Sequence, residues 1–170
     1  HPQLKRLVSV SDMPIDFSTI LVAAACIVEQ DGKYLMIQEG HQFAAGMWSH
    51  PAGLVEKGER LADAARREVQ EETGYEVEII GVLAVTNLQK VAFRDYHSPH
   101  QHVLKVTFAG RLVGTPAGER EAEIKDVQWL TKEEILARAE QLRDKDIPML
   151  IERMERKQTL PQDVLVEFEQ

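Results

Sequence analysis

The sequence predicts an α+β fold in which helices cover the faces of a β-sheet. Strand-like apolar runs dominate the first two thirds of the chain, and helical patterns dominate its end. The 170 residues are enough for one domain with a substantial core. A composition of 44% hydrophobic and 28% charged residues is typical of a soluble globular protein. We expect no membrane span, because no run of about 18 apolar residues occurs.

The chain opens with an irregular segment and a hairpin. Residues 1–16 mix Pro, Ser and Asp, so we expect an arm ahead of a single domain over residues 17–170. Two apolar runs, Thr19–Gln30 and Lys33–Glu39, flank Asp31-Gly32, which is a strong signal for a β-hairpin.

The remaining elements follow in order. "MWSHPAG" predicts a short strand that ends at Pro51, and "LVEKGE" predicts a loop. A helix is expected from Arg60 to Thr73, closed by Gly74 as its C′ residue. We then expect a strand over Glu76–Leu88, a polar histidine-rich loop over residues 90–102, and strands over Val103–Val113 and Val127–Leu130. Helices are expected over Thr131–Arg143 and Pro148–Lys157. The Thr131–Arg143 helix starts with a capping box of Thr131 and Glu134.

The single cysteine and the net charge restrict the function. Cys26 lies in the first apolar run, so we expect a buried structural thiol. One cysteine excludes a disulfide framework and fits a reducing cytoplasm. The net charge of −8 argues against a protein that binds nucleic acid duplexes through a basic face. An anionic ligand would therefore need a bound cation to neutralise it.

The glutamates in the second half of the 60–73 helix point the wrong way for a solvated helix. On a helical wheel, Glu68 and Glu72 fall within the apolar stripe of the helix, and Glu71 lies at its edge. Buried carboxylates are costly unless they are paired or bind metal, and like charges four residues apart repel. An ion-pair network with Arg67 is one alternative, but one arginine cannot neutralise three acids. Carboxylate oxygens gathered on one face suit Mg²⁺, Mn²⁺ or Ca²⁺.

These residues complete a longer pattern that resembles the Nudix box of the Nudix hydrolases. The pattern runs through Gly53, Glu59, Arg67-Glu68, Glu71-Glu72 and Gly74, and "WSHPAG" and "VQWLTKEEI" on either side are also similar to the family. The one departure is Tyr75, where an aliphatic residue is usual, and it bears on packing rather than chemistry. The resemblance implies an α/β/α sandwich with a mixed β-sheet, in which the box forms a loop–helix–loop.

The resemblance also implies roles for individual residues. The metal, Mg²⁺ or alternatively Mn²⁺, would be bound by Glu68, Glu71 and Glu72 together with the backbone carbonyl of Gly53. Glu59 and Arg67 would pair and orient the loop against the helix. Glu68, Glu71, Arg67 and Glu59 form the expected catalytic set, in which the general base stays open. A further acid often comes from a later loop, and the candidates are Glu119, Glu121 and Glu123, with Glu123 preferred because it lies just before the last strand.

Other residues are candidates for contact with the substrate. Tyr96 and His97 could meet a substrate ring, and Trp48 is expected near the pocket. His50 either touches phosphate or is an ordinary polar residue at a strand end. His97, His100 and His102 could form a zinc site, but their spacing fits a polar loop over the pocket better.

The sequence favours a substrate class without fixing it. The first hypothesis is a Mg²⁺-dependent pyrophosphohydrolase, and the alternatives are a non-catalytic nucleotide-binding module and a Ca²⁺-binding structural domain. The proline that marks ADP-ribose enzymes is replaced by Val91, and the C-terminal stretch resembles bacterial Nudix phosphatases that act on thiamine pyrophosphate and nucleoside di- and triphosphates. ADP-ribose or another nucleoside diphosphate-linked substrate is the second choice. The partner is thus a small phosphate ester, and a homodimer stays open.

Overall fold

The computed structural model describes residues 20–40, 44–91, 101–114, 118 and 120–166. The predicted arm, Tyr96, His97, His100 and Glu119 lie outside these residues. The strands are β1 (Ile20–Gln30), β2 (Lys33–Glu39), β3 (Trp48–Ser49), β4 (Ala52–Leu54), β5 (Val77–Val91), β6 (Gln101–Leu112) and β7 (Ile124–Thr131). The helices are α1 (Leu61–Thr73), α2 (Lys132–Leu136) and α3 (Ile147–Glu155), with 3-10 turns η3 (Ala139–Gln141) and η4 (Gln162–Val164).

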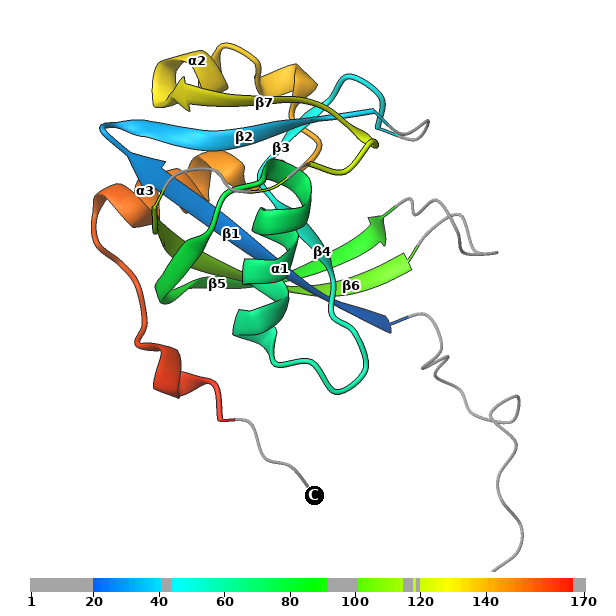
Figure 1. The fold of residues 1–170 in the computed structure, drawn as a ribbon, viewed down its shortest axis with the longest axis vertical. Coiled ribbons are helices and arrows are strands. Elements are labelled where there is room, and N and C mark those ends of the chain that lie inside the picture. The colour runs from blue at the N-terminus through cyan, green and yellow to red at the C-terminus, as the bar shows by residue number, and fades with distance from the viewer. Residues whose placement is uncertain (1–19, 41–43, 92–100, 115–117, 119, 167–170) are drawn as a thin grey trace, which may run out of the picture.

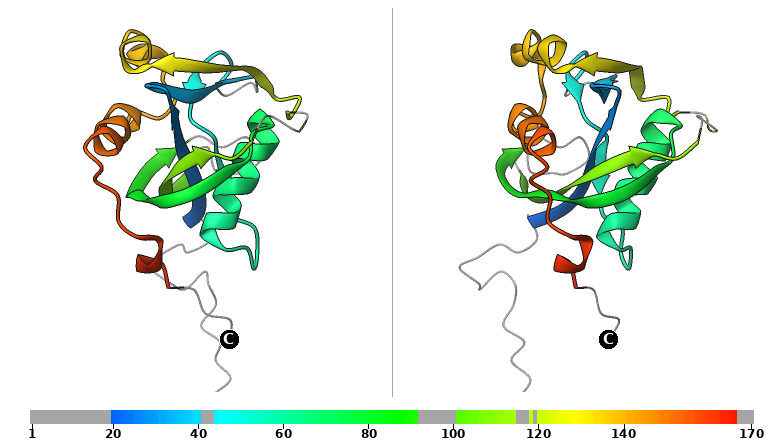
Figure 2. Two further views of the ribbon diagram at one scale, coloured as in Figure 1. Left: turned by 60° about the vertical axis from the view of Figure 1, so that its left-hand side comes forward. Right: turned by 90° about the vertical axis from the view of Figure 1, so that its left-hand side faces the viewer.

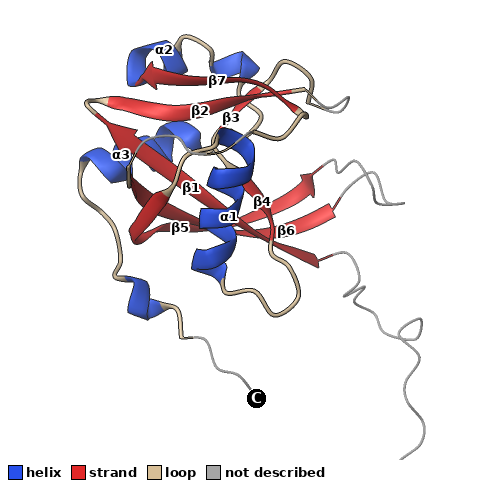
Figure 3. Ribbon diagram, in the orientation of Figure 1, coloured by secondary structure: helices blue, strands red, loops and turns tan. Residues whose placement is uncertain are grey.

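The strands form one mixed sheet (Figures 1 and 3). The order is β3-β2-β1-β6-β5, while β4 pairs with β1 and β7 pairs with β2. β1 and β6 run parallel, and the other described pairs are antiparallel. The β1–β2 pairing covers only the hairpin end, from Glu29 to Tyr34, so the two halves of the sheet diverge beyond it.

Helices cover the sheet on opposite sides, as Figure 2 shows for α1 and α3 on either side of β1. Alternate residues of each strand face alternate sides. Ala24, Cys26 and Phe108 therefore pack with the apolar stripe of α1, while Ile27 and Ala109 pack with α3. The predicted helix-covered mixed sheet is confirmed.

The hairpin and the buried cysteine are also confirmed. Asp31 and Gly32 both have positive φ, 52° and 75°, as a type I′ turn requires. Cys26 is fully buried, and burial raises the pKa of its thiol to about 12, so it stays protonated. Among the described residues, no helix is long and apolar enough to cross a membrane.

The expected helix over Thr131–Arg143 is wrong in length. Its capping box is present, with the Glu134 N–H donating to Thr131 Oγ1, but α2 ends at Leu136 and only a 3-10 turn follows. Leu142 is extended, with ψ 124°, because it is buried and bridges to Trp48 of β3. A continuous helix could not make that bridge.

Two strand assignments also need correction. The strand expected to end at Pro51 ends at Ser49, and a second strand, β4, follows from Ala52. Pro51 has no N–H to donate, and the chain passes there from pairing with β2 to pairing with β1. The loop expected over residues 90–102 is shorter, since the β5–β6 ladder continues to the Val91–Gln101 pair. Polar side chains conceal this extension, because the ladder is made by the backbone.

Candidate active site

The inward face of α1 carries both apolar and acidic side chains. Ala65 and Val69 are fully buried, and Glu68 and Glu72 on the same face are only 9% and 7% exposed. Glu71 lies at the edge, with its side chain 43% exposed. The C-terminal end of α1 points toward β2 and β3 (Figure 1), so the acids lie where the two halves of the sheet diverge.

Glu72 has little to offset its burial. Among the described residues, its carboxylate accepts a hydrogen bond of 3.0 Å from the backbone N–H of Ala52. Burial raises the pKa of Glu72 well above its ordinary value, and the charge of Glu68 adds to this. The Ala52 N–H and the more distant Arg143 act in the opposite direction.

Glu68 lies directly against the backbone of Gly53. A methyl group added at Gly53 would lie 2.2 Å from the Glu68 carboxylate, so only glycine leaves room for that side chain here. Burial raises the pKa of Glu68, while hydrogen bonding to Arg67 lowers it. The structure thus brings the predicted Gly53 and Glu68 together.

Arg67 ties the loop before α1 to the helix. Its guanidinium bonds Glu59 at 2.8 and 2.9 Å and the carbonyl of Leu54 at 3.1 Å. It also bonds Glu68 at 2.6 Å and Glu71 at 3.0 Å. The predicted Glu59–Arg67 pair is present, and hydrogen bonding to Glu59 is the main cause that raises the pKa of Arg67.

The site fits a divalent cation. Its donors are hard carboxylate oxygens, and Glu72 is buried without an ion pair among the described side chains. In the part of the chain that the structure describes, no three His, Cys, Asp or Glu side chains already form a metal cage. Arg67 takes part of that space, so Glu68, Glu72 and the Gly53 carbonyl are the groups best placed to hold a cation beside it.

The later acidic loop approaches the helix through Glu121. Its backbone N–H donates to the carbonyl of Glu71 at 2.8 Å, and its charge raises the pKa of Glu68. Glu123, the residue preferred from the sequence, is exposed, and its carbonyl accepts from the N–H of Gly40 at 2.8 Å. Glu121 is exposed as well, so the choice between these two acids stays a prediction.

Trp48 and His50 are buried beside the box. Trp48 is 5% exposed, packs in the core and lies under the Arg138 guanidinium, 5.8 Å from its ring centre. His50 is fully buried, and neither ring nitrogen has a hydrogen-bond partner among the described residues, although Nδ1 lies 3.5 Å from Asp144. Burial lowers the pKa of His50 to about 3, and the charge of Lys105 contributes.

A buried polar network that the sequence analysis missed extends from His50. Lys105, 3% exposed, pairs with Asp146 at 3.1 Å and with Asp144 at 3.4 Å. Burial would raise the pKa of Asp144, but the charges of Arg143 and Lys105 lower it below its usual range. The available signal was Lys105 itself, which shares a strand face with buried Val103 and Ala109.

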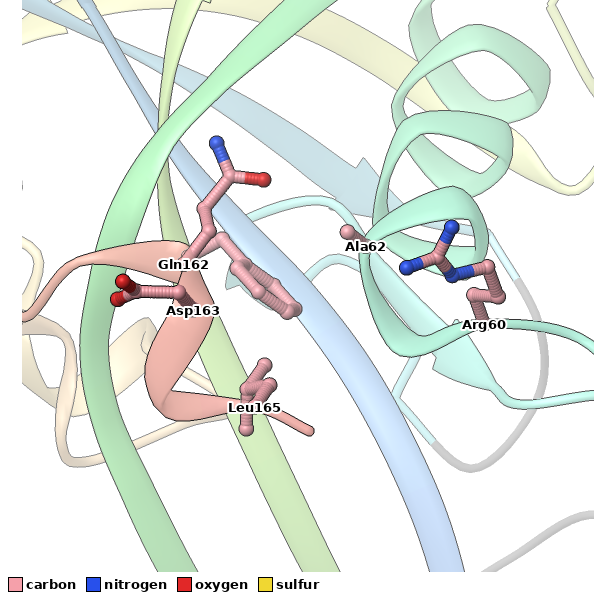
Figure 4. Close-up of a pocket in the computed structure, with 6 residues that line it drawn as sticks. Arg60, Ala62, Gln162, Asp163 and Leu165 are labelled. Atoms are coloured by element: carbon pink, nitrogen blue, oxygen red, sulfur yellow. The ribbon is translucent and has the colours of Figure 1, made fainter. Parts of the chain in front are cut away.

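A separate pocket of about 190 Å³ lies at the other end of α1. Figure 4 shows Arg60 and Ala62 on one side of it and Gln162 and Leu165 on the other. The carboxylates occupy the last turns of the helix, so this pocket is not part of the candidate site.

Comparison with known proteins agrees with this geometry. The model of the NUDIX domain matches residues 19–151. The chain belongs to the NUDIX domain family. Its Nudix box occupies β4, α1 and the loop between them, which is the predicted loop–helix–loop.

Named relatives of this Nudix domain are hydrolases and phosphatases. It is 31% identical to Putative nudix hydrolase 1 of Caenorhabditis elegans over 134 residues, or 77% of this chain but 34% of that protein. The chain thus spans about a third of that relative. It is 29% identical to Phosphatase NudJ of Shigella boydii serotype 4 over 149 residues, 86% of this chain and 91% of that protein. A NUDIX hydrolase from Nitrosomonas europaea has the same fold, with a TM-score of 0.77, 28% identity, and coverage of 87% of this chain and 97% of that one.

Proposed function

We propose that this Nudix domain is a pyrophosphohydrolase that depends on a divalent metal and cleaves a small di- or triphosphate. The observation that carries the proposal is the pair of buried carboxylates, Glu68 and Glu72, on the inward face of α1. Among the described side chains, Arg67 hydrogen-bonds Glu68 and not Glu72, and Arg143 lowers the pKa of Glu72 through its charge without a hydrogen bond to it. A cation would supply the missing charge, with Mg²⁺ preferred and Mn²⁺ as an alternative.

The reaction follows from the chemistry of these groups. Water attacks phosphorus, the P–O bond to the leaving phosphate breaks, and a carboxylate of the cluster accepts the proton. Glu68 is a candidate for this step, since its raised pKa favours proton uptake. Glu59 and Arg67 would hold the loop and Glu68 in position. A bound cation would activate water and draw charge from the phosphate.

The proposed substrates are thiamine pyrophosphate and nucleoside di- and triphosphates. The C-terminal resemblance found in the sequence supports this class, and the similarity to Phosphatase NudJ over most of both chains supports phosphatase chemistry. Val91, in place of the proline that marks ADP-ribose enzymes, weighs against ADP-ribose. A cytoplasmic setting and a small-molecule partner belong to the same proposal.

A substrate panel tests the proposal directly. Metal-free protein is assayed for phosphate release from thiamine pyrophosphate, nucleoside di- and triphosphates and ADP-ribose, with Mg²⁺, with Mn²⁺ and with EDTA. We expect turnover that EDTA abolishes, and a higher kcat/KM for the first two classes. A tenfold or greater advantage for ADP-ribose, about 1.4 kcal/mol at the transition state, reverses the substrate assignment. Binding without turnover of any compound would favour the non-catalytic module.

A further inference from the structure

Arg143 lies beside the candidate site although it is about seventy residues from the Nudix box in sequence. It follows η3, and its backbone N–H donates to the carbonyl of Trp48 at 2.9 Å. Four residues after Trp48, the N–H of Ala52 holds the Glu72 carboxylate. One short segment therefore joins the backbone of Arg143 to the metal-binding acid.

Two acids fix the guanidinium of Arg143. It pairs with Glu39, which is 3% exposed, and Nη2 lies 3.4 Å from Asp144 Oδ2. Asp144 is further held by Ser49 Oγ at 3.3 Å. The side chain of Arg143 is nevertheless 30% exposed, so these acids do not close it off completely from solvent. An arginine that is oriented by acids and still accessible is well suited to bind a phosphate.

The charge of Arg143 acts on a glutamate of the Nudix box. The positive charge of Arg143 lowers the pKa of Glu72, against the larger effect of burial. The other cations that the structure describes near the site are less suitable for a ligand, because Arg67 already bonds three acids and a carbonyl, and Lys105 is 3% exposed. Arg143 thus combines proximity to Glu72 with an accessible surface.

We propose that Arg143 binds a phosphate group of the substrate, and that Glu39 and Asp144 orient its guanidinium for that contact. The proposal rests on the proposed function, since it requires a phosphate substrate. It gives this acidic protein a second positive group whose charge acts on the site, besides Arg67.

Binding measurements separate this role from a structural one. Imidodiphosphate, which resists hydrolysis, is titrated calorimetrically into the Mn²⁺-loaded protein, and Mn²⁺ alone is titrated in parallel. We expect Arg143→Gln to weaken imidodiphosphate binding at least tenfold and to raise KM more than it lowers kcat. Arg143→Lys should recover part of the loss, because it keeps the charge without the fork. Mn²⁺ affinity should stay unchanged or increase, since a repelling cation is removed.

Two further variants guard against misfolding and a general charge effect. Arg143→Gln removes one partner of the buried Glu39. The Arg143→Gln/Glu39→Gln double variant, with the net charge kept at −8, should therefore fold yet still bind imidodiphosphate weakly. Arg156→Gln removes an exposed cation of α3 that pairs with Glu152 and should bind normally.

The outcomes distinguish the two proposals. Wild-type protein that binds imidodiphosphate but hydrolyses none of the panel overturns the enzymatic function, and the Arg143 comparison still stands. Normal imidodiphosphate binding by the folded double variant overturns the role of Arg143, whatever the turnover. Failure of the wild-type protein to bind imidodiphosphate also overturns the role of Arg143.

Discussion

Glu68 and Glu72 are placed where an isolated domain would avoid negative charge. Both are buried on the face of α1 that also buries Ala65 and Val69, and both have raised pKa values, chiefly through burial. Such groups lower the stability of the free protein whenever they ionise. Under the proposed function, a bound cation would make the arrangement favourable, and these residues would then favour function at the expense of stability.

Replacing Glu72 by Gln separates these two effects. Glutamine keeps the size and one acceptor oxygen but removes the charge. We expect a rate at least a hundredfold lower, a loss of about 3 kcal/mol at the transition state, because a charged metal ligand is gone. The melting temperature in EDTA should be unchanged or higher, since the desolvation cost and the repulsion from Glu68 disappear.

The control is Glu76→Gln, an equal charge change at an exposed position just beyond α1. It should leave both rate and stability near wild type. A Glu72→Gln protein that melts earlier in EDTA while turning over normally would mean that Glu72 is a structural anion.

Gly53→Ala tests the contact between the β4 backbone and Glu68. The added methyl would lie 2.2 Å from the carboxylate, which is the movable end of a side chain, so the fold should adapt by displacing Glu68. We expect a folded protein with at least tenfold lower kcat/KM and weaker Mn²⁺ binding. Gly118→Ala, whose nearest contact would be 3.7 Å, is the control. Full activity of Gly53→Ala would show that Glu68 does not need this position.

At the scale of single residues, the sequence was informative where periodicity applies. The helical wheel gave the inward direction of Glu68 and Glu72 because both lie on one regular helix. It could not find the network around Lys105 and Asp144, whose members come from β6 and from the segment just before α3. Contacts between distant segments leave no periodic signal.

At the scale of elements, the segment from Trp48 to Gly53 connects the two halves of the sheet to the site. It pairs with β2 at Ser49 and with β1 at Ala52, and it buries His50 between these two pairings. The groups that act on His50 are Lys105, Arg143, Asp144 and Asp146, and burial is the largest influence. His50 is therefore neutral in the folded protein well below its usual pKa.

The buried His50 predicts a loss of stability in acid. The pKa of His50 is about 3 in the folded protein and 6.5 in the unfolded chain. Between these pH values the unfolded chain binds a proton on His50 that the folded protein does not bind. Stability should fall as pH drops below about 6.5, by up to about 1.4 kcal/mol per pH unit from this residue. The raised pKa values of Glu68 and Glu72 act in the opposite direction, so the wild-type slope is a sum.

His50→Gln isolates this contribution because glutamine does not titrate. Urea unfolding in EDTA at pH 7.5, 6.5 and 5.5 should give a variant whose stability falls less steeply than that of the wild type below pH 6.5. Parallel curves for the two proteins would show that His50 has the same pKa in the folded and unfolded states. A wild type whose stability falls less steeply than that of the variant would show that His50 is protonated in the folded state, with Asp144 as its ion-pair partner.

Regular elements were predictable, and their interruptions were less so. The Asp31-Gly32 turn, α1 and its Gly74 cap follow from local residue preferences. The early end of α2 does not, because Leu142 is drawn into the core by its bridge to Trp48, nearly a hundred residues away. The Tyr75 departure from the family pattern is a packing change, since its hydroxyl accepts from Trp129 Nε1 at 3.1 Å.

At the scale of the whole molecule, the net charge of −8 and the buried carboxylates both favour the binding of cations. Overall charge acts at long range and is screened by any salt, whereas the carboxylates of α1 act at short range and require a specific ion. Stability measurements can therefore separate a general salt effect from occupation of the site.

Divalent metal should raise the melting temperature through the site. A cation that binds only the folded protein at a hundred times its Kd adds about 2.7 kcal/mol of stability. For a chain of 170 residues, at about 2–4 °C per kcal/mol, this corresponds to a rise of roughly 5–11 °C. Sodium chloride at matched ionic strength should give a much smaller rise, because it screens the net charge without entering the site. Glu72→Gln should lose most of the specific rise and Glu76→Gln should keep it. An equal rise in both variants would place the stabilising cation elsewhere on the acidic surface, and the buried carboxylates of α1 would then need another counter-charge.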